Sequence, residues 1–180
     1  MLVNTKKKNI KVCLVQLCSS NILKDNIKKI IELEKISESV DLILLPEMVN
    51  IFEKNKEKLT IQIKTMYEDL FIKKCISLAK KKNAWLLIGS AVVKEKNNFF
   101  NRSILLNNLG EIVIYYDKIN LFKANIKGNF IDENNLYKRG SIGKIKNTPW
   151  GKVAFCICYD LRFPNLFRSY AQKGARIIFV

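Results

Sequence analysis

Residues 41–47, Asp-Leu-Ile-Leu-Leu-Pro-Glu, form a short apolar run that ends at a proline and a carboxylate. An unbroken run of this kind is typical of a strand buried on both faces, and the proline stops it. Residues 21–39 upstream carry isoleucines and leucines at helical spacing, and residues 11–17 form a second short run of β-forming residues. Together these segments predict a strand, a helix and a strand, which is a βαβ unit.

The segments that follow extend this sheet and break its strict alternation of strands and helices. Residues 60–82 have the mixed three- and four-residue spacing of one long amphipathic helix, and residues 84–93 predict a third strand. Residues 102–107 and 111–118 flank Asn-Leu-Gly and predict a hairpin, which introduces an antiparallel element. We expect residues 119–140 to form a long loop.

The remaining segment predicts a second hairpin, a helix and a final strand. The hairpin comprises residues 143–147 and 152–158, joined through Thr-Pro-Trp-Gly, and residues 159–164 open a helix that runs to about residue 173. Residues 175–180 are an apolar strand in which the sequence stops. Because a buried strand at a chain end is uncommon, we expect a fragment, or a fold whose remaining layer comes from elsewhere.

The composition indicates one soluble domain. The chain has 180 residues, 48% of them hydrophobic, which suits a single core and is too short for two. We assign residues 1–9 to a flexible basic tail and residues 10–180 to the domain. No stretch approaches the roughly 20 apolar residues of a membrane span. Histidine is absent, which excludes Ser-His-Asp catalysis, Cys-His catalysis and histidine metal sites.

The formal charge of +16, from 32 basic and 16 acidic residues, is open to two interpretations. The positive charge could bind a nucleic acid or an anionic membrane, or it could belong to a lysine-rich surface that only contacts solvent. Only five of the basic residues are arginine, and the lysines are scattered along helical stretches beside Asn and Ile. Proteins that read phosphates and bases favour arginine forks and interleaved aromatic residues. We therefore favour the solvated surface and expect no specific nucleic-acid partner and no membrane partner.

The five cysteines, Cys13, Cys18, Cys75, Cys156 and Cys158, are an odd number without a signal-peptide pattern ahead of them. This usage favours reduced thiols in an intracellular compartment, and we expect a cytoplasmic protein. Cys156 and Cys158 offer two soft ligands without a histidine or a second pair. We therefore expect no metal.

Three chemically complementary residues, Glu47, Lys118 and Cys158, each follow a predicted strand, which is where open α/β sheets place their sites. A cysteine nucleophile without histidine needs another base and another cation, and a carboxylate and an ammonium supply both. Each residue also has an ordinary alternative. Cys158 could be a small buried hydrophobe, as we expect for Cys156, Glu47 a strand-end charge in solvent, and Lys118 a surface lysine. Only their combination favours a Glu-Lys-Cys site.

Three motifs containing these residues resemble the signatures of the nitrilase superfamily of carbon-nitrogen hydrolases. The motifs are Leu45-Pro-Glu47, Tyr116-Asp-Lys118-Ile-Asn-Leu-Phe122 and Cys158-Tyr-Asp-Leu-Arg-Phe-Pro164, of which the third is highly specific. The resemblance covers nearly the whole chain, including residues 12–16, 87–90 and 148–152 and Asn101. It is closest to the Nit amidase branch, which contains ω-amidase and deaminated glutathione amidase.

The resemblance implies roles for individual residues. Cys158 corresponds to the nucleophile, Glu47 to the general base and Lys118 to the cation that supports the tetrahedral intermediate. Glu133 matches the family's second glutamate, which supports the lysine and the substrate amine, and the amide N–H of Tyr159 would help to form the oxyanion hole.

Four positions depart from the family pattern: Asn120 stands in place of histidine, Lys123 of aspartate, Arg139 of proline and Asn165 of glutamate. None of them removes the proposed triad, although each bears on local loop geometry. The family's carboxyl-terminal third, which completes the fold and includes part of the dimer contact, has no counterpart in this sequence.

The sequence thus predicts an α/β fold, an incomplete four-layer α-β-β-α sandwich of the nitrilase type. We expect an amidase that acts on a small amide bearing a carboxylate, without a metal or organic cofactor, and that forms a homodimer when complete. The alternative from another class is a noncatalytic basic domain that binds nucleic acid or serves as a scaffold.

Overall fold

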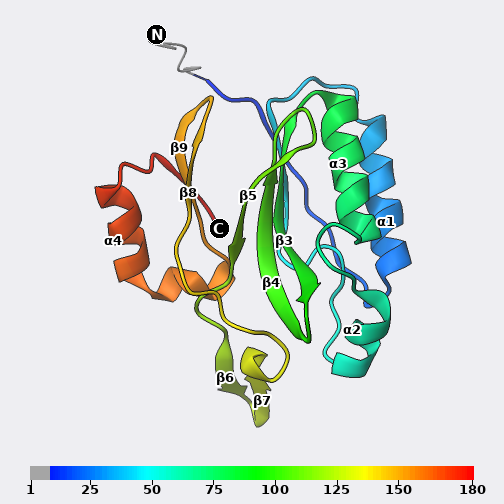
Figure 1. Cartoon of the computed structure of the whole chain (residues 1–180), viewed down its shortest axis with the longest axis vertical. Helices are drawn as coiled ribbons and strands as arrows, with labels where there is room; N and C mark the ends of the chain where they lie inside the picture. Colours follow the sequence, from blue (N-terminus) through cyan, green and yellow to red (C-terminus); the bar gives the residue numbers. More distant parts are fainter. Residues whose placement is uncertain (1–8) are drawn as a thin grey trace.

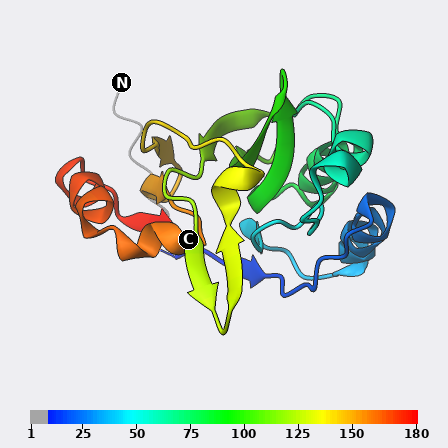
Figure 2. The ribbon, with the colours of Figure 1, turned by 90° about the horizontal axis from the view of Figure 1, so that it is seen from below.

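The computed structural model describes residues 9–180, and these form four layers (Figures 1 and 2). Helices α1 (Leu23–Glu32) and α3 (Leu70–Lys82) cover one face of a five-stranded sheet. Its other face packs on a three-stranded sheet, and helix α4 (Pro164–Gln172) covers the outer face of that smaller sheet. This arrangement confirms the predicted α-β-β-α order. The tail predicted for residues 1–9 lies, apart from Asn9, outside the described residues.

The five-stranded sheet has the order β1-β2-β3-β4-β5. Its strands are β1 (Val12–Leu14), β2 (Leu42–Leu45), β3 (Trp85–Glu95), β4 (Asn98–Leu106) and β5 (Ile112–Asp117). The first three strands are parallel, which confirms the βαβ unit, and β3-β4 and β4-β5 are antiparallel. Because β5 therefore runs in the same direction as β2, the carboxyl ends of these two strands lie at the same edge of the sheet.

The smaller sheet has the order β10-β9-β8 and contains the second predicted hairpin. Its strands are β8 (Ile145–Thr148), β9 (Gly151–Phe155) and β10 (Ile177–Phe179), with β10 parallel to β9. Between β9 and α4 lies the short 3-10 helix η3 (Cys158–Arg162). The helix predicted to open at residues 159–164 therefore has two parts, and Pro164 begins the second.

The prediction of a single long helix over residues 60–82 is wrong. The structure has α2 (Lys56–Gln62) and then α3, with residues 63–69 between them. Asp69 ends the interruption, because its Oδ1 accepts hydrogen bonds from the amides of Phe71 and Ile72 and so caps α3. The helix predicted for residues 21–39 is also shorter, since α1 ends at Glu32 and is followed by the 3-10 helix η1 (Leu33–Lys35).

Two hairpins lie where the sequence suggested none. Strand β4 begins at Asn98, directly after a tight turn in which Lys96 has a φ of 56°. The predicted loop over residues 119–140 contains a hairpin of strands β6 (Lys123–Ile126) and β7 (Asn129–Asp132), followed by the 3-10 helix η2 (Glu133–Asn135). This hairpin projects from the body of the molecule (Figures 1 and 2). The turn residues of the β6-β7 hairpin, Lys127 and Gly128, both have positive φ, as tight hairpin turns require.

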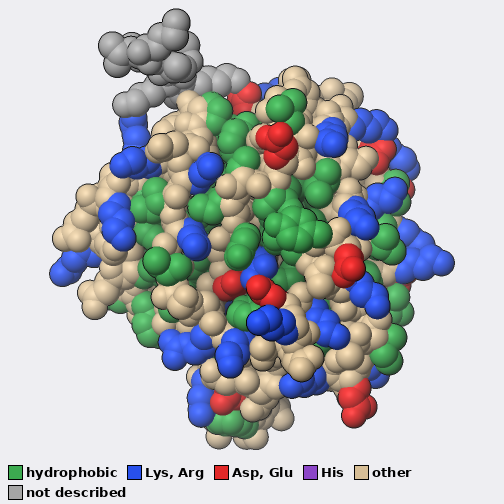
Figure 3. All heavy atoms as spheres, in the orientation of Figure 1, with side chains coloured by type: hydrophobic (Ala, Val, Ile, Leu, Met, Phe, Trp, Pro, Cys, Tyr) green, Lys and Arg blue, Asp and Glu red, His purple; other side chains and the backbone are tan. Residues whose placement is uncertain are grey.

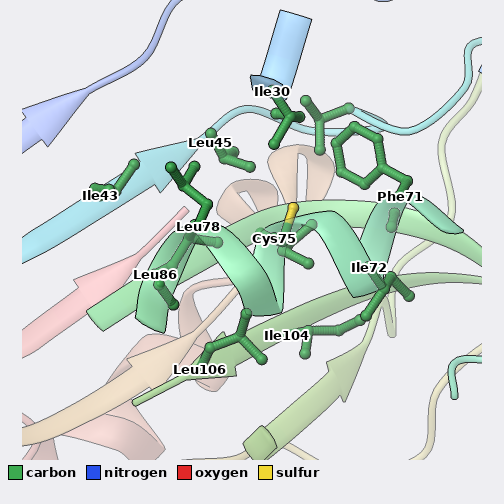
Figure 4. Packing of buried hydrophobic residues seen from close by; sticks show 14 of the residues in the cluster. Ile30, Ile43, Leu45, Phe71, Ile72, Cys75, Leu78, Leu86, Ile104 and Leu106 are labelled. Carbon is green, nitrogen blue, oxygen red and sulfur yellow. The ribbon is translucent and has the colours of Figure 1, made fainter. Parts of the chain in front are cut away.

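The core has separate apolar layers between the structural layers. Figure 4 shows the side chains of α3, such as Phe71, Ile72, Cys75 and Leu78, packed between α1 and the strands of the large sheet. A second cluster joins the two sheets, and at its margin the rings of Trp85 and Trp150 meet edge to face with centroids 5.3 Å apart. The sheets are therefore held together by hydrophobic burial.

On the face shown in Figure 3, lysine and arginine side chains are interspersed with other side chains of every type. Among the described residues, no helix is long and apolar enough to cross a membrane.

Candidate active site

Glu47 lies at the carboxyl end of β2, where the chain is clamped to β3. The amide of Met48 donates a hydrogen bond of 2.8 Å to Ser90 Oγ, and the amide of Val49 donates one of 2.9 Å to the Ser90 carbonyl. The close approach requires glycine at position 89, because a Cβ there would lie 2.1 Å from the Leu45 carbonyl oxygen. The backbone around Glu47 is therefore fixed, while its side chain remains 32% exposed.

Lys118 follows β5 and is the buried cation of the site, with 1% of its surface exposed. Its Nζ lies 3.0 Å from Glu47 Oε1 and 3.1 Å from Glu133 Oε1. Burial works to lower the pKa of Lys118, but the two carboxylates outweigh it and raise that pKa above its ordinary value. Lys118 therefore remains an ammonium at neutral pH.

Glu133 opens the 3-10 helix after the projecting hairpin and closes the base of that hairpin. Its Oε2 accepts a hydrogen bond of 2.7 Å from the Phe122 amide, and its own amide donates one of 2.9 Å to the Phe122 carbonyl. The same carboxylate contacts Lys118. The hairpin and the buried ammonium thus share one anchor.

Cys158 lies at the junction of β9 with the 3-10 helix, in a strained backbone conformation with a φ of 45°. This elbow exposes the Cys158 thiol, while Cys156 two residues earlier is buried as expected. Burial and the charge of Glu47 raise the pKa of Cys158, and Lys118 opposes them. The resting group is therefore a thiol with a carboxylate beside it.

Tyr159 connects the elbow with the lysine loop through its ring. The ring meets Phe122 edge to face at 5.2 Å and Phe163 at 5.6 Å between centroids. The structure therefore brings all five predicted site residues into one region, and they come from both sheets.

Asp160 is a structural member of the site for which sequence reasoning gave no role. It is fully buried, and its Oδ2 accepts hydrogen bonds from the Tyr116 hydroxyl and the Ile157 amide. Its Oδ1 accepts from both the amide and the side-chain Nδ2 of Asn120, each at 2.9 Å. Asn120, a departure from the family pattern, therefore ties the lysine loop to the cysteine elbow. The Asp of the Cys-Tyr-Asp motif was visible in the sequence, but its partners were not.

Asn101 of β4 is a second such residue. Its side-chain Nδ2 donates a hydrogen bond of 2.9 Å to Glu47 Oε1. The sequence marked this asparagine as part of the family resemblance and gave it no role.

A cavity of about 810 Å³ lies beside the two glutamates. Glu47 and Glu133 are among its lining residues, and Phe52 and the hairpin residues Ile126 and Phe130 supply apolar walls. This volume suits a small organic molecule. Within residues 9–180, no group of three or more Cys, Asp or Glu side chains could hold a metal ion.

Comparisons with known proteins agree with this geometry. The model of the carbon-nitrogen hydrolase family matches residues 11–180. The deaminated glutathione amidase of Yersinia enterocolitica is 29% identical over 96% of this chain and 62% of its own length. The omega-amidase NIT2-B of Xenopus laevis is 26% identical over 93% of this chain and 61% of its own.

The crystal structure of the C. elegans NitFhit protein superposes with a TM-score of 0.81 and 26% identity, over 94% of this chain and 42% of that one. The chain thus spans about 62% of the length of the first of these relatives. Because the family model covers nearly every described residue, the chain belongs to the carbon-nitrogen hydrolases of the nitrilase superfamily.

Proposed function

We propose that this protein hydrolyses an amide through Cys158, with Glu47 as general base and Lys118 as the stabilising cation. The observation that carries the proposal is the contact of a buried ammonium with two carboxylates, 3.0 Å from Glu47 and 3.1 Å from Glu133, beside a thiol whose pKa the charge of Glu47 raises. This arrangement supplies a nucleophile, a base and a positive charge without histidine.

In the first half of the reaction, Glu47 takes the thiol proton while the Cys158 sulfur forms a bond to the amide carbonyl carbon. The electron pair of the C=O bond moves to oxygen, and the Lys118 ammonium and the Tyr159 N–H stabilise the resulting oxyanion. Collapse of this intermediate breaks the C–N bond. Glu47 returns the proton to the leaving nitrogen, so that ammonia departs and a thioester remains.

In the second half, Glu47 takes a proton from water and the hydroxide oxygen attacks the thioester carbon. Collapse of the second tetrahedral intermediate breaks the C–S bond, releases a carboxylic acid and returns the proton to the Cys158 sulfur. Glu133 keeps the ammonium in place and accepts a hydrogen bond from the substrate amine. The residues described here complete the cycle without a cofactor.

We further propose that the substrate carries a carboxylate, as α-ketoglutaramate and deaminated glutathione do. Lys54 lines the cavity and, within residues 9–180, forms no ion pair. Of the neighbouring acids, Glu53 accepts hydrogen bonds from the amides of Lys54 and Asn55 through Oε1, and Asp132 is bonded to Asn134 and paired with Lys123. We propose that the Lys54 ammonium is the group that receives the substrate anion.

The activity belongs to the protein at its natural length, which we propose to be a cytoplasmic homodimer. The alternative of a noncatalytic basic scaffold or nucleic-acid-binding domain is less favoured, since such a domain has no chemical reason to keep Glu47, Lys118, Glu133 and Cys158 in contact.

Ammonia release from a dicarboxylic acid monoamide, such as α-ketoglutaramate, tests the proposal. The natural-length protein and Cys18→Ala, which changes the other exposed thiol, should release ammonia at equal rates. Cys158→Ala should show no release above background. Equal rates for Cys158→Ala and Cys18→Ala would refute the proposed function.

A further inference from the structure

Asn101 is a polar residue in the interior of a central strand. It lies in β4 opposite Val92 of β3, and only 1% of its surface is exposed. Asparagine is depleted in strands, and a buried amide costs stability unless its donors and acceptor are used. The position therefore calls for an explanation beyond packing.

Asn101 contacts both charged partners of the proposed site. Its side-chain Nδ2 donates to Glu47 Oε1 at 2.9 Å, and its carbonyl oxygen accepts a hydrogen bond of 2.9 Å from the Lys118 amide. One residue thus fixes the side chain of the proposed base and the backbone of the proposed cation.

The two side-chain donors to Glu47 use the same oxygen. Asn101 Nδ2 and Lys118 Nζ both bond to Oε1, so neither of them occupies Oε2. A carboxylate held by one oxygen in this way cannot rotate freely about its last bond. Its second oxygen is then the one that can receive the thiol proton.

The orientation of the Asn101 amide is determined by Glu47 and leaves its own oxygen without a partner. A carboxylate oxygen accepts hydrogen bonds, so the amide must present Nδ2 to Glu47 and direct Oδ1 elsewhere. Within the described residues, Asn101 Oδ1 is buried and has no hydrogen-bond partner. An asparagine with a purely structural role would have a hydrogen-bond donor for its side-chain oxygen. The bond to Glu47 is therefore made at a cost in folding stability.

We propose that Asn101 is a positioning residue, which holds Glu47 Oε1 against Lys118 and thereby presents Glu47 Oε2 to the Cys158 thiol. The inference rests on the proposed function, because it gives Asn101 a role in that same chemistry. It differs from a structural role in one respect that can be measured. Removal of the amide should harm the reaction while leaving the fold as stable as before, or more stable.

The test compares Asn101→Leu and Asn101→Ala with Ser103→Ala in the natural-length protein. Ser103 lies two positions along β4 on the same face, and its hydroxyl makes only a 3.4 Å bond to the Ile88 carbonyl. We expect Asn101→Leu to lower kcat roughly 10- to 100-fold with little change in KM, because the base is misplaced and substrate binding is not. Its melting temperature should equal or exceed that of the unchanged protein, and Ser103→Ala should keep its kcat.

Asn101→Ala covers the case in which leucine does not fit the site. An unchanged kcat in either soluble variant would overturn the proposal. So would a fall in kcat that merely follows a fall in melting temperature, since that pattern belongs to a structural residue.

A second readout does not depend on amidase activity. The rate of alkylation of Cys158 by iodoacetamide, followed by mass spectrometry against pH, reports how closely Glu47 acts on the thiol. Glu47→Gln removes a charge that raises the pKa of Cys158 and should move the midpoint of labelling to lower pH. Asn101→Leu should move it in the same direction by a smaller amount.

A midpoint for Asn101→Leu equal to that of the unchanged protein would overturn the positioning role even in a protein that hydrolysed none of the amides tested. Conversely, a shifted midpoint without amide hydrolysis would retain the positioning of Glu47 and reject the proposed function. The two failures are therefore distinguishable.

Discussion

The hydroxyl group of Tyr116 donates a hydrogen bond of 2.6 Å to Asp160 Oδ2, across 44 positions of sequence. Tyr116 lies in β5, two residues before Lys118, and Asp160 lies two residues after Cys158. This bond therefore connects the strand that carries the cation with the turn that carries the thiol, and it joins the two sheets at the site.

Tyr116→Phe should lower the free energy of unfolding by about 1–3 kcal/mol, because a buried carboxyl group loses one of its donors. The matched control is Tyr115→Phe, since the Tyr115 ring is partly exposed and lies 4.0 Å from the Arg102 guanidinium. Urea denaturation measures both variants, and equal stability would contradict the structural importance of the bond to Asp160.

Lys118→Met should slow the alkylation of Cys158. Burial and the charge of Glu47 raise the pKa of the thiol and Lys118 opposes them, so removal of the ammonium should raise that pKa further. At pH 8, fewer Cys158 groups would be thiolates, and labelling by iodoacetamide should be roughly 3- to 10-fold slower. Cys18, the other exposed thiol, is the internal control and should label at an unchanged rate.

Asp69→Asn should make the protein more stable at neutral pH. Burial is the main cause that raises the pKa of Asp69, from 3.8 to about 6, and its Oδ2 is buried without a partner among the described residues. Between these two pH values the folded state binds more protons than the unfolded state, so stability falls as pH rises and the loss is complete above pH 6.

Asparagine retains the capping oxygen for α3 and cannot ionise. The stability of Asp69→Asn relative to the unchanged protein should therefore increase by about 3 kcal/mol from pH 3.5 to pH 7.5, as measured by urea denaturation. A difference that stays constant over this range would show that Asp69 does not titrate in the folded protein.

Gly140→Ala should disturb the backbone that carries Lys118. A Cβ at position 140 would lie 2.2 Å from the Asp117 carbonyl oxygen, and the Gly140 amide donates a hydrogen bond of 2.8 Å to the Lys118 carbonyl. Because backbone must move to admit the methyl group, we expect a loss of about 1–3 kcal/mol of stability together with reduced kcat. Ser141→Ala, at the neighbouring exposed position, is the control. A fully active and stable Gly140→Ala would contradict the observed packing.

Lys54→Ala should weaken the binding of amides that carry a carboxylate. With the cation removed, KM for such a substrate should rise roughly 3- to 10-fold while kcat changes little, and a neutral amide should be unaffected. Lys56→Ala, two positions away and outside the cavity, should leave both substrates unchanged. Equal effects of Lys54→Ala on charged and neutral amides would reject the role of Lys54 in carboxylate binding.

The sequence predicted the elements whose signals are local. The apolar run of residues 41–46 and the elbow at Cys158 were recognisable because strands and turns leave patterns within a few residues. The break before α3 was missed, since the isoleucines on either side keep helical spacing and only the cap by Asp69 shows where the helix begins. The projecting hairpin was missed because its turn contains lysine at a position with positive φ, where glycine or asparagine is expected.

The residues of the site likewise divide into those with a local sequence signal and those whose contacts form only in the tertiary structure. Glu47, Lys118 and Cys158 were predicted from strand ends and from the family resemblance, and the structure brings them together. The partners of Asp160 could not be predicted, because Tyr116 and Asn120 reach it only after the two sheets pack. Contacts of this kind depend on tertiary structure and leave no periodic signal in the sequence.

The edge-to-face contact between Trp85 and Trp150 has a practical consequence. These are the only two tryptophans of the chain, and one belongs to the large sheet while the other lies in the turn between β8 and β9 of the small one. Glu47 and Lys118 follow strands β2 and β5 of the first sheet and Cys158 follows strand β9 of the second, so the proposed chemistry exists only while the sheets are docked. The intrinsic tryptophan fluorescence therefore reports whether the two sheets are docked, and with them the proposed active site, without any added probe.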